Sequence, residues 1–220
     1  MSESFALKVP DALTPDLVPW ARIVYSSRTG NTQSVAEHLA SNLDLSLVNA
    51  REELAARMDD RGPDGRLMRG DTAGTADEIL LLGFWAWRGG PNPTMRDFMR
   101  GLRRRRVFVF GTMAAWPDSD HARGCIACAK ELLDEGGNEL IGHFVCQGRL
   151  APAIRKHSHH PRTPEREARL DEAEKHPDAA DLASALASAR SALGPFMPRW
   201  REDIFAGGSV STKSRKFPCS

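Results

Sequence analysis

Short apolar runs alternate along the chain with segments whose apolar residues recur at helical spacing. Five apolar runs have the length and residue types of β-strands, and they cover residues 21–26, 45–48, 78–84, 107–110 and 139–146. The run at 78–84 is the strongest, because it contains Ile-Leu-Leu-Leu without a polar interruption. Such a continuous run is typical of a central parallel strand that is covered on both faces.

Helical patterns separate and follow these strands. They predict helices at residues 31–42, 51–58, 93–102, 119–135, 165–174 and 178–192. Strands that alternate with helices favour an α/β fold with a doubly wound, five-stranded parallel sheet, because right-handed crossovers place helices on both faces. The last two helices follow the fifth strand and are predicted to form a helical C-terminal extension.

The chain is predicted to contain one domain and two terminal segments. Its 220 residues suit a single α/β domain with an extension better than two full domains. Residues 1–20 contain three prolines and little apolar pattern, so we predict an N-terminal leader on the surface. The domain itself is expected to cover residues 21–193. Residues 194–220 lack an apolar period and predict a flexible C-terminal tail.

Charge and composition argue against several classes of partner. The chain carries 30 basic and 29 acidic residues, a net charge of +1, so no strong field attracts nucleic acid. No apolar run approaches the roughly 20 residues that membrane insertion requires, and the first residues lack the pattern of a secretory signal. Four cysteines without a disulfide-like spacing are typical of a reducing compartment, so we expect a cytoplasmic protein.

The turn between the first strand and the first helix has the composition of a phosphate site. It runs from Ser27 to Thr32 and reads Ser-Arg-Thr-Gly-Asn-Thr. The first N–H groups of a helix have no partner within the helix, and the helix dipole favours an anion beside them. Three hydroxyl side chains can donate further hydrogen bonds, and Gly30 lets the backbone approach a ligand closely. These residues predict a cradle for a terminal phosphate monoester.

Three other interpretations of this turn can be compared with a phosphate site. A turn rich in serine and threonine before a helix is by default an N-cap, and that interpretation stays open on the turn alone. The turn lacks the Gly-Lys-Ser/Thr ending of a Walker loop and the Gly-x-Gly-x-x-Gly pattern of a dinucleotide turn. A phosphate site is favoured because three hydroxyls and a glycine occur together directly after the first strong strand.

At this turn the chain resembles the flavodoxin family. The family pattern Ser/Thr-x-Thr-Gly-x-Thr binds the phosphate of FMN, and residues 27–32 match it at every fixed place. The resemblance implies a flavodoxin-like sheet of order 2-1-3-4-5, in which strands one, three and four are neighbours. It assigns the phosphate end of FMN to Ser27, Arg28, Thr29, Gly30, Asn31 and Thr32.

Two further turns are expected to meet the phosphate turn. In an open parallel sheet, ligands bind beyond the carboxyl ends of the strands, where the strand order reverses. With the flavodoxin order, the turns after strands three and four converge with the turn after strand one. The resemblance therefore implies that the flavin ring lies between two groups of residues, namely Trp85, Ala86, Trp87, Arg88 and Gly89 after strand three, and Gly111, Thr112, Met113, Ala114 and Trp116 after strand four.

The tryptophans of these turns leave packing alternatives open. Trp85 continues an apolar strand, so core packing and stacking on a flavin ring are equally good interpretations. Trp87 is followed by Arg88 and two glycines, which favours contact with a ligand. Trp116 precedes a proline, so it could simply stiffen a turn.

The resemblance extends over residues 20–192 and includes features of one bacterial branch of flavodoxin-domain proteins. The similar segments are 83–85, 89–90, 110–112, 146–148 and 176–178. That branch has Gly-Phe-Trp after strand three, and it includes an accessory protein of bacterial bilirubin reduction. The resemblance implies an FMN-binding electron-transfer protein that serves a partner reductase, with bilirubin reduction as one candidate role.

Two features depart from electron-carrying flavodoxins. Those proteins are usually strongly acidic, whereas this chain is near neutral and has Arg28 and Arg88 in the flavin turns. They also usually have an aromatic residue, often tyrosine, after strand four, where this chain offers Trp116 and His121. Cations near the ring favour the anionic reduced flavin, so we predict a less negative reduction potential than in acidic flavodoxins.

Three other groups of residues have weaker functional interpretations. Cys125 and Cys128 form a Cys-x-x-Cys at the start of a helix, but a zinc site needs two more ligands, and structural thiols are the favoured interpretation. The histidine-rich segment 157–160 is interpreted as a solvated loop, and Arg103–Arg106 as a solvent-facing basic segment. We predict neither a metal site nor a catalytic acid or base.

Three functions therefore follow as hypotheses. The first is an FMN-binding protein that passes electrons to or from a partner reductase, in which the cofactor supplies the redox chemistry. The second is an FMN-dependent reductase that acts directly on a small substrate. The third is a non-redox module that has kept the fold but lost the flavin.

Overall fold

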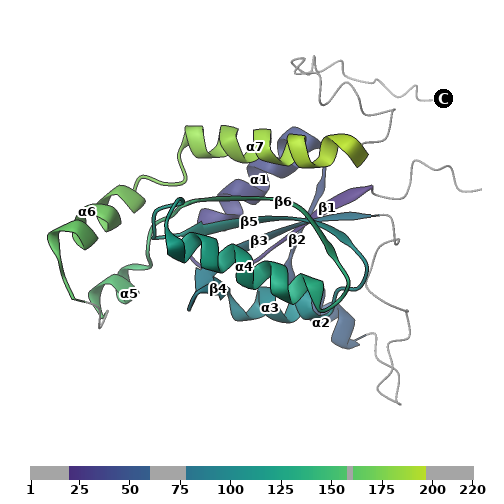
Figure 1. Ribbon diagram of the computed structural model, residues 1–220, viewed down its shortest axis with the longest axis horizontal. Coiled ribbons are helices and arrows are strands. Elements are labelled where there is room, and N and C mark those ends of the chain that lie inside the picture. The colour runs from purple at the N-terminus through teal and green to yellow at the C-terminus, as the bar shows by residue number, and fades with distance from the viewer. Residues whose placement is uncertain (1–19, 60–77, 158–160, 197–220) are drawn as a thin grey trace, which may run out of the picture.

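A parallel sheet lies at the centre of the molecule (Figure 1). The computed structural model describes residues 20–59, 78–157 and 161–196. Its strands follow the order β2-β1-β3-β5-β6, which confirms the predicted order, since β5 and β6 are the fourth and fifth predicted strands. Their bounds are Ala21–Tyr25 for β1, Ser46–Asn49 for β2, Ile79–Trp87 for β3, Arg106–Met113 for β5 and Glu139–Gln147 for β6.

Helices cover both faces of the sheet (Figure 1). One face carries α1 (Asn31–Leu43) and α7 (Ala179–Leu193). The other face carries α2 (Ala50–Asp59), α3 (Pro93–Arg100) and α4 (Asp120–Asp134). Two helices, α5 (Pro152–Lys156) and α6 (Pro164–Ala173), project from one end, and a 3₁₀ turn (Gly194–Phe196) follows α7.

No helix within the described ranges is both long enough and apolar enough to cross a membrane.

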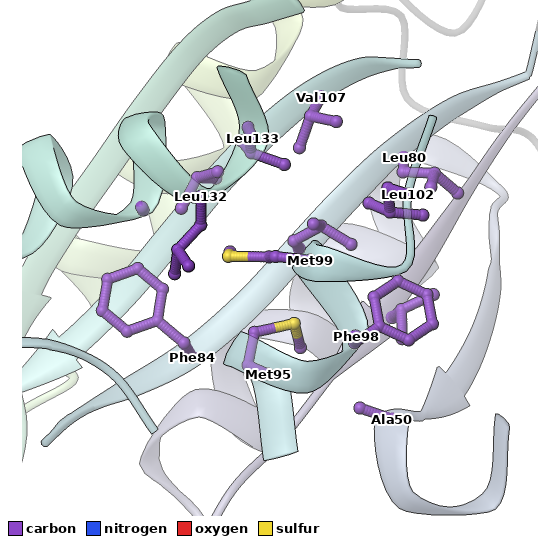
Figure 2. Packing of buried hydrophobic residues seen from close by; sticks show 14 of the residues in the cluster. Ala50, Leu80, Phe84, Met95, Phe98, Met99, Leu102, Val107, Leu132 and Leu133 are labelled. Carbon is purple, nitrogen blue, oxygen red and sulfur yellow. The ribbon is translucent and has the colours of Figure 1, made fainter. Parts of the chain in front are cut away.

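The two faces of the sheet have separate hydrophobic cores. On the α3 side, Met95 and Met99 recur at helical spacing and pack with Phe84 of β3 and Leu132 of α4 (Figure 2). On the α1 side, apolar residues of β1, β3 and β5 pack against α1 and against the small side chains of α7. The side chains of β3 point into the hydrophobic core on both faces of the sheet. For this reason β3 requires the unbroken apolar run that the sequence contains.

Two glycine–phenylalanine pairs connect β3 and β5. Gly83 pairs with Phe110, and Phe84 pairs with Gly111. A Cβ atom on Gly83 would lie 2.4 Å from the Phe110 ring, and one on Gly111 would lie 2.7 Å from the Phe84 ring. Each ring therefore fills the space that a side chain on the facing strand would need. These contacts bring the carboxyl ends of the two strands together at a defined register.

The two central strands are longer than the sequence pattern predicts. The pattern ends the third strand at Phe84, but β3 continues to Trp87, because its end pairs antiparallel with a short strand, β4 (Gly90–Pro91). In the same way β5 continues to Met113, which pairs with Gln147 of β6. The residues expected in turns after these strands therefore lie largely on the strands themselves.

The C-terminal part also differs in detail from the prediction. The sequence pattern places no helix between the fifth strand and residue 165, but the structure contains α5 there. Nearly all of the predicted leader (residues 1–20) and of the predicted tail (residues 194–220) lies outside the described residues, so both assignments stay predictions.

Candidate functional site

Helix α1 begins without a side-chain cap. Its N-cap residue is Gly30, which has a φ of +90° and carries no side chain that could accept a hydrogen bond from the first turn. Ser27 Oγ accepts a hydrogen bond from the Gly30 N–H at 3.2 Å, which folds the turn back on itself. No acidic residue occurs in the first turn of the helix. The unpaired N–H groups and the positive end of the helix dipole can therefore receive an anion.

Hydrogen bonds join the phosphate turn to the ends of β3 and β5. The buried hydroxyls of Thr32 and Thr112 lie 2.8 Å apart and share a hydrogen bond. The Ser26 N–H donates to the Gly83 carbonyl at 2.9 Å, and the buried Asn92 amide donates to Ser26 Oγ at 2.9 Å. These bonds join segments that are far apart in the sequence, so the three predicted turns meet at one edge of the sheet.

Two tryptophans stand side by side at the end of β3. The Trp85 and Trp87 ring centroids are 5.5 Å apart, and the rings meet edge to face at 71°. The Arg28 guanidinium carbon lies 5.7 Å from the Trp85 ring centroid, and that of Arg88 lies 5.4 Å from the Trp87 centroid. Both guanidiniums are close enough for cation–π attraction. The cluster therefore combines aromatic surface with positive charge beside the phosphate turn.

A two-residue turn explains why the tryptophans lie on paired strands. Arg88 and Gly89 have φ angles of +48° and +78°. Left-handed conformations at both central positions are typical of the tight hairpin turns whose twist matches that of the flanking strands. The hairpin formed by β3 and β4 thereby holds Trp87 against its neighbour rather than leaving it in an open loop.

A cavity of about 130 Å³ lies where these segments meet. Residues of the phosphate turn, the end of β3, the end of β5 and the segment after β6 form its wall. Nine predicted site residues line it, namely Arg28, Thr29, Asn31, Trp85, Ala86, Trp87, Thr112, Met113 and Ala114. The wall also contains Gly148, Arg149, Leu150, Ala151 and Ile154, which the sequence pattern did not single out as site residues.

The segment after β6 is fastened directly to the phosphate turn. The Asn31 side-chain amide donates to the Arg149 carbonyl at 3.0 Å, and the Arg149 guanidinium donates to the Thr29 carbonyl at 3.1 Å. A Cβ on Gly148 would lie 2.6 Å from the Asn31 amide nitrogen, so this close approach requires glycine. Two features point to this fourth segment of the site, namely the family resemblance at residues 146–148 and the position of β6 beside β5 in the sheet.

Seven predicted site residues lie outside the wall of this cavity. A hydrogen bond joins Ser27 and Gly30 within the turn, and Thr32 shares one with Thr112. Arg88 and Gly89 form the hairpin turn. The last two are Gly111, which lies beneath the Phe84 ring, and Trp116, whose surface is 44% exposed. Their assignment to a cofactor stays a prediction.

The rim of the site is positively charged. Arg28, Arg88 and Arg149 are exposed, and within the described ranges none of them forms an ion pair with a carboxylate. The cavity wall itself contains no Asp, Glu, His or Cys. An anionic ligand at this site would therefore meet favourable charge without a neighbouring carboxylate that repels it.

The remaining candidate groups have structural explanations. Burial raises the pKa of the Cys125 thiol to about 11, with a further contribution from Cys128, so Cys125 lacks the low pKa of a reactive thiol. His176, Asp178 and Asp181 are close enough together to suggest a metal site, but the two aspartates form the capping box of α7. Residues 158–160 of the histidine-rich segment lie outside the described residues.

The sequence of this chain matches that of a known protein family. Residues 22–190 match the Flavodoxin domain. A flavodoxin-like domain-containing protein BilS from Clostridioides difficile (strain CD3) is 26% identical over 137 residues, which cover 60% of this chain and 68% of the relative. The BilS of Clostridium symbiosum (strain WAL-14163) is 30% identical over 139 residues, which cover 60% of this chain and 70% of the relative.

Solved flavodoxin structures resemble this chain only distantly. Oxidised Flavodoxin 1 from Bacillus cereus is 15% identical, with a TM-score of 0.40, and the likeness covers 74% of this chain and 97% of that chain. A WrbA-like flavodoxin from Agrobacterium tumefaciens is 14% identical, with a TM-score of 0.40, over 76% of this chain and 98% of that chain. These likenesses concern the fold alone. The match to the Flavodoxin domain covers residues 22–190, which is most of the chain, and the chain therefore belongs to the flavodoxin-domain family.

Proposed function

We propose that the chain binds FMN and transfers electrons to or from a partner protein. The observation that carries the proposal is the cavity in which the uncapped start of α1 meets the tryptophans of β3 and the end of β5. A phosphate monoester suits the helix start, and a flat aromatic ring suits the tryptophans. When bound, FMN supplies the electron storage that the side chains around the cavity lack.

The phosphate end of the cofactor would be held by groups around the first turn of α1. Thr29 and Asn31 line the cavity there, and the Arg149 guanidinium already crosses the turn to the Thr29 carbonyl. A guanidinium and a phosphate form charge-assisted hydrogen bonds, which are stronger than neutral ones. Arg149 would therefore add a cationic contact that the turn sequence alone does not contain.

The ring end of the cofactor would lie against aromatic and apolar side chains. Trp85 and Trp87 offer aromatic faces, and Met113 and Ala114 offer apolar surface from the neighbouring strand end. Contact of this kind contributes about 0.5–1.5 kcal/mol per aromatic pair beyond the burial of apolar area. It also excludes water from the ring, which strengthens the effect of nearby charges on its reduction.

Electron transfer to a partner is favoured over acid–base chemistry by the composition of the cavity wall. The wall contains no side chain that exchanges a proton near neutral pH. The exposed guanidiniums of Arg28, Arg88 and Arg149 would attract a partner whose docking face is acidic. We propose a reductase as that partner, and the resemblance noted in the sequence makes bilirubin reduction one candidate setting.

The proposal is tested by titrating flavin-free protein with FMN and, in parallel, with riboflavin, which lacks the phosphate. Quenching of flavin fluorescence reports binding of either compound. We expect riboflavin to bind at least about tenfold more weakly, because it cannot use the charge-assisted contacts at the start of α1. A protein that binds neither flavin would contradict the proposal and favour a non-redox module. Equal affinity for both flavins would contradict the phosphate site.

A flavin-dependent reductase that acts directly on a small molecule is the second candidate function. One observation favours it, namely a larger cavity of about 640 Å³ beside the first. Turnover of a small acceptor by the isolated protein with a nicotinamide donor would support this alternative. Reduction that occurs only when a partner reductase is present would support the first proposal.

A further inference from the structure

We infer that the larger cavity beside the cofactor site binds a small apolar molecule that carries a carboxylate. The inference rests on the proposed function, because it concerns a ligand held next to FMN. The cavity has a volume of about 640 Å³ and lies between the end of β5, the start of α4 and the two projecting helices α5 and α6. This volume is within the range of about 300–1,000 Å³ that is typical of small-molecule sites.

The larger cavity directly adjoins the smaller one. Five residues line both cavities, namely Ala86, Met113, Ala114, Leu150 and Ile154. All five have apolar side chains, so the boundary between the two spaces is apolar. A molecule in the larger cavity would therefore share walls with a ring bound beside Trp85 and Trp87.

The far wall of the larger cavity comes from α6 and carries positive charge. Arg166 and Arg169 line it, and no Asp or Glu does. Arg166 is already paired, since its guanidinium lies 3.0 Å from a carboxylate oxygen of Glu167. Arg169 forms no ion pair within the described ranges, and its Nε is buried without a hydrogen-bond partner there. Arg169 is therefore the cation in this wall that lacks an anion.

The hydroxyl groups of the wall are already engaged in capping helices. Ser119 accepts a hydrogen bond from the Ala122 N–H at the start of α4, and Thr163 accepts one from the Arg166 N–H at the start of α6. His121 is the other titratable side chain in the wall, and its Nε2 lies 3.8 Å from the Cys125 sulfur. Arg169, whose buried Nε has no hydrogen-bond partner within the described ranges, is thus the group left for polar recognition, and a guanidinium can bind a carboxylate through two hydrogen bonds.

The helices that form this wall are tied to each other by ion pairs. Arg155 of α5 lies 3.0 Å from Glu167, 2.6 Å from Asp171 and 3.6 Å from Glu174. These carboxylates lie around Arg155, and within the described ranges none of them forms an ion pair with Arg169. These ion pairs hold α5 and α6 together, so Arg155 has a structural role, whereas Arg169 lines the cavity.

The test uses FMN-loaded protein and 2-naphthoate as the probe, with neutral 2-naphthalenemethanol as its uncharged counterpart. Isothermal titration calorimetry reports the affinity for each compound. We expect 2-naphthoate to bind roughly tenfold more tightly than the alcohol, because only the carboxylate pairs with Arg169. Arg169→Gln should remove this preference, Arg169→Lys should retain part of it, and Arg162→Gln on the exposed surface should leave it unchanged.

A second variant tests the location independently of Arg169. Ala115 lines only the larger cavity, so Ala115→Leu should weaken 2-naphthoate binding and leave the affinity for FMN unchanged. Competition between 2-naphthoate and FMN would overturn the inference, as would equal affinity for the two probes or no effect of Arg169→Gln. In each case the FMN titration separately reports whether the proposed function holds, so the two failures are distinguishable.

Discussion

Arg149 joins two distant parts of the chain through both its side chain and its backbone. Its guanidinium donates to the Thr29 carbonyl, while its own carbonyl accepts from the Asn31 amide. The guanidinium also lies 4.0 Å from the position that a Cβ of Gly30 would take. It is thus placed beside the uncapped start of α1, where the proposed phosphate would add a partner of opposite charge.

We predict that Arg149→Ala raises the dissociation constant for FMN by about tenfold, the cost of losing one hydrogen bond to a charged group. The same variant should leave riboflavin affinity nearly unchanged, because riboflavin has no phosphate. Fluorescence titration of flavin-free protein measures both. Arg123→Ala, on the exposed surface of α4, is the matched control and should alter neither affinity. An equal loss for both flavins would indicate a purely structural role of Arg149.

At the scale of secondary-structure elements, the packing of β3 against β5 depends on phenylalanine rings that lie over glycine residues of the facing strand. Phe110 covers Gly83, and Phe84 covers Gly111. Overfilling such a site forces side chains or backbone to shift, which typically costs about 1–3 kcal/mol. Since both strands end at the cavity, the same contacts position the proposed ring site.

We predict that Gly83→Ala and Gly111→Ala each destabilise the protein by about 1–3 kcal/mol in urea unfolding, because the new Cβ atom would collide with a buried ring. Gly124→Ala is the matched control, since Gly124 lies within α4 and a Cβ there would meet nothing within 4 Å. It should stabilise the protein by roughly 0.5–1 kcal/mol through helix propensity. Destabilisation by all three variants would contradict this explanation.

A histidine that lies just before α7 couples its charge to stability. His176 Nδ1 is hydrogen-bonded to the Asp181 carboxylate, and its Nε2 lies 3.5 Å from a Glu172 oxygen. The hydrogen bond to Asp181 raises the pKa of His176 above its ordinary value of 6.5, although burial acts in the opposite direction. Protonated His176 therefore links the start of α7 to the end of α6.

We predict that His176→Gln destabilises the protein more at pH 5.5 than at pH 9. A histidine whose pKa is raised in the folded state contributes its full stabilisation below its unfolded pKa of about 6.5. The contribution is lost as the pH rises through the folded pKa, where the neutral imidazole replaces the cation. Urea unfolding of both proteins at the two pH values measures the difference. An equal loss at both pH values would show that the charge of His176 contributes nothing.

At the scale of the whole molecule, charge is distributed unevenly although its sum is close to zero. The chain has a net charge of +1, but the rim of the candidate site exposes Arg28, Arg88 and Arg149. Two of these guanidiniums lie over the tryptophan rings. The local field at the site is therefore positive, and it acts on any anion or reduced ring bound there.

We predict that Arg28→Gln and Arg88→Gln each make the two-electron potential of bound FMN more negative, on the order of tens of millivolts at low ionic strength. Removing a nearby cation withdraws Coulomb stabilisation from the reduced, anionic flavin. Spectroelectrochemical titration measures the potential, and added salt should diminish the difference. Arg100→Gln, on the outer surface of α3, serves as the control. A potential that is unchanged in both site variants would contradict the proposed role of the rim charges.

Most of the fold was predictable because it depends on local patterns. The apolar run of β3, the alternation of strands and helices, and the hydroxyl-rich turn before α1 all lie within short stretches of sequence. The predicted strand order came from the family resemblance and is confirmed. The ends of β3 and β5 were less predictable, because pairing with β4 and β6 extends them beyond their apolar runs.

The sequence by itself determined the parallel α/β fold and the hydroxyl-rich turn before α1, because apolar periodicity and turn chemistry are properties of neighbouring residues. Only the tertiary structure decided that Arg149 reaches that turn and that Arg169, whose Nε has no hydrogen-bond partner among the described residues, lines a second cavity. The placement of Arg149 depends on contacts between residues 118 and 120 positions apart in the sequence. The placement of Arg169 depends on a helix that follows the last strand. No local pattern encodes such contacts, since the free energy that fixes them arises when the whole chain packs.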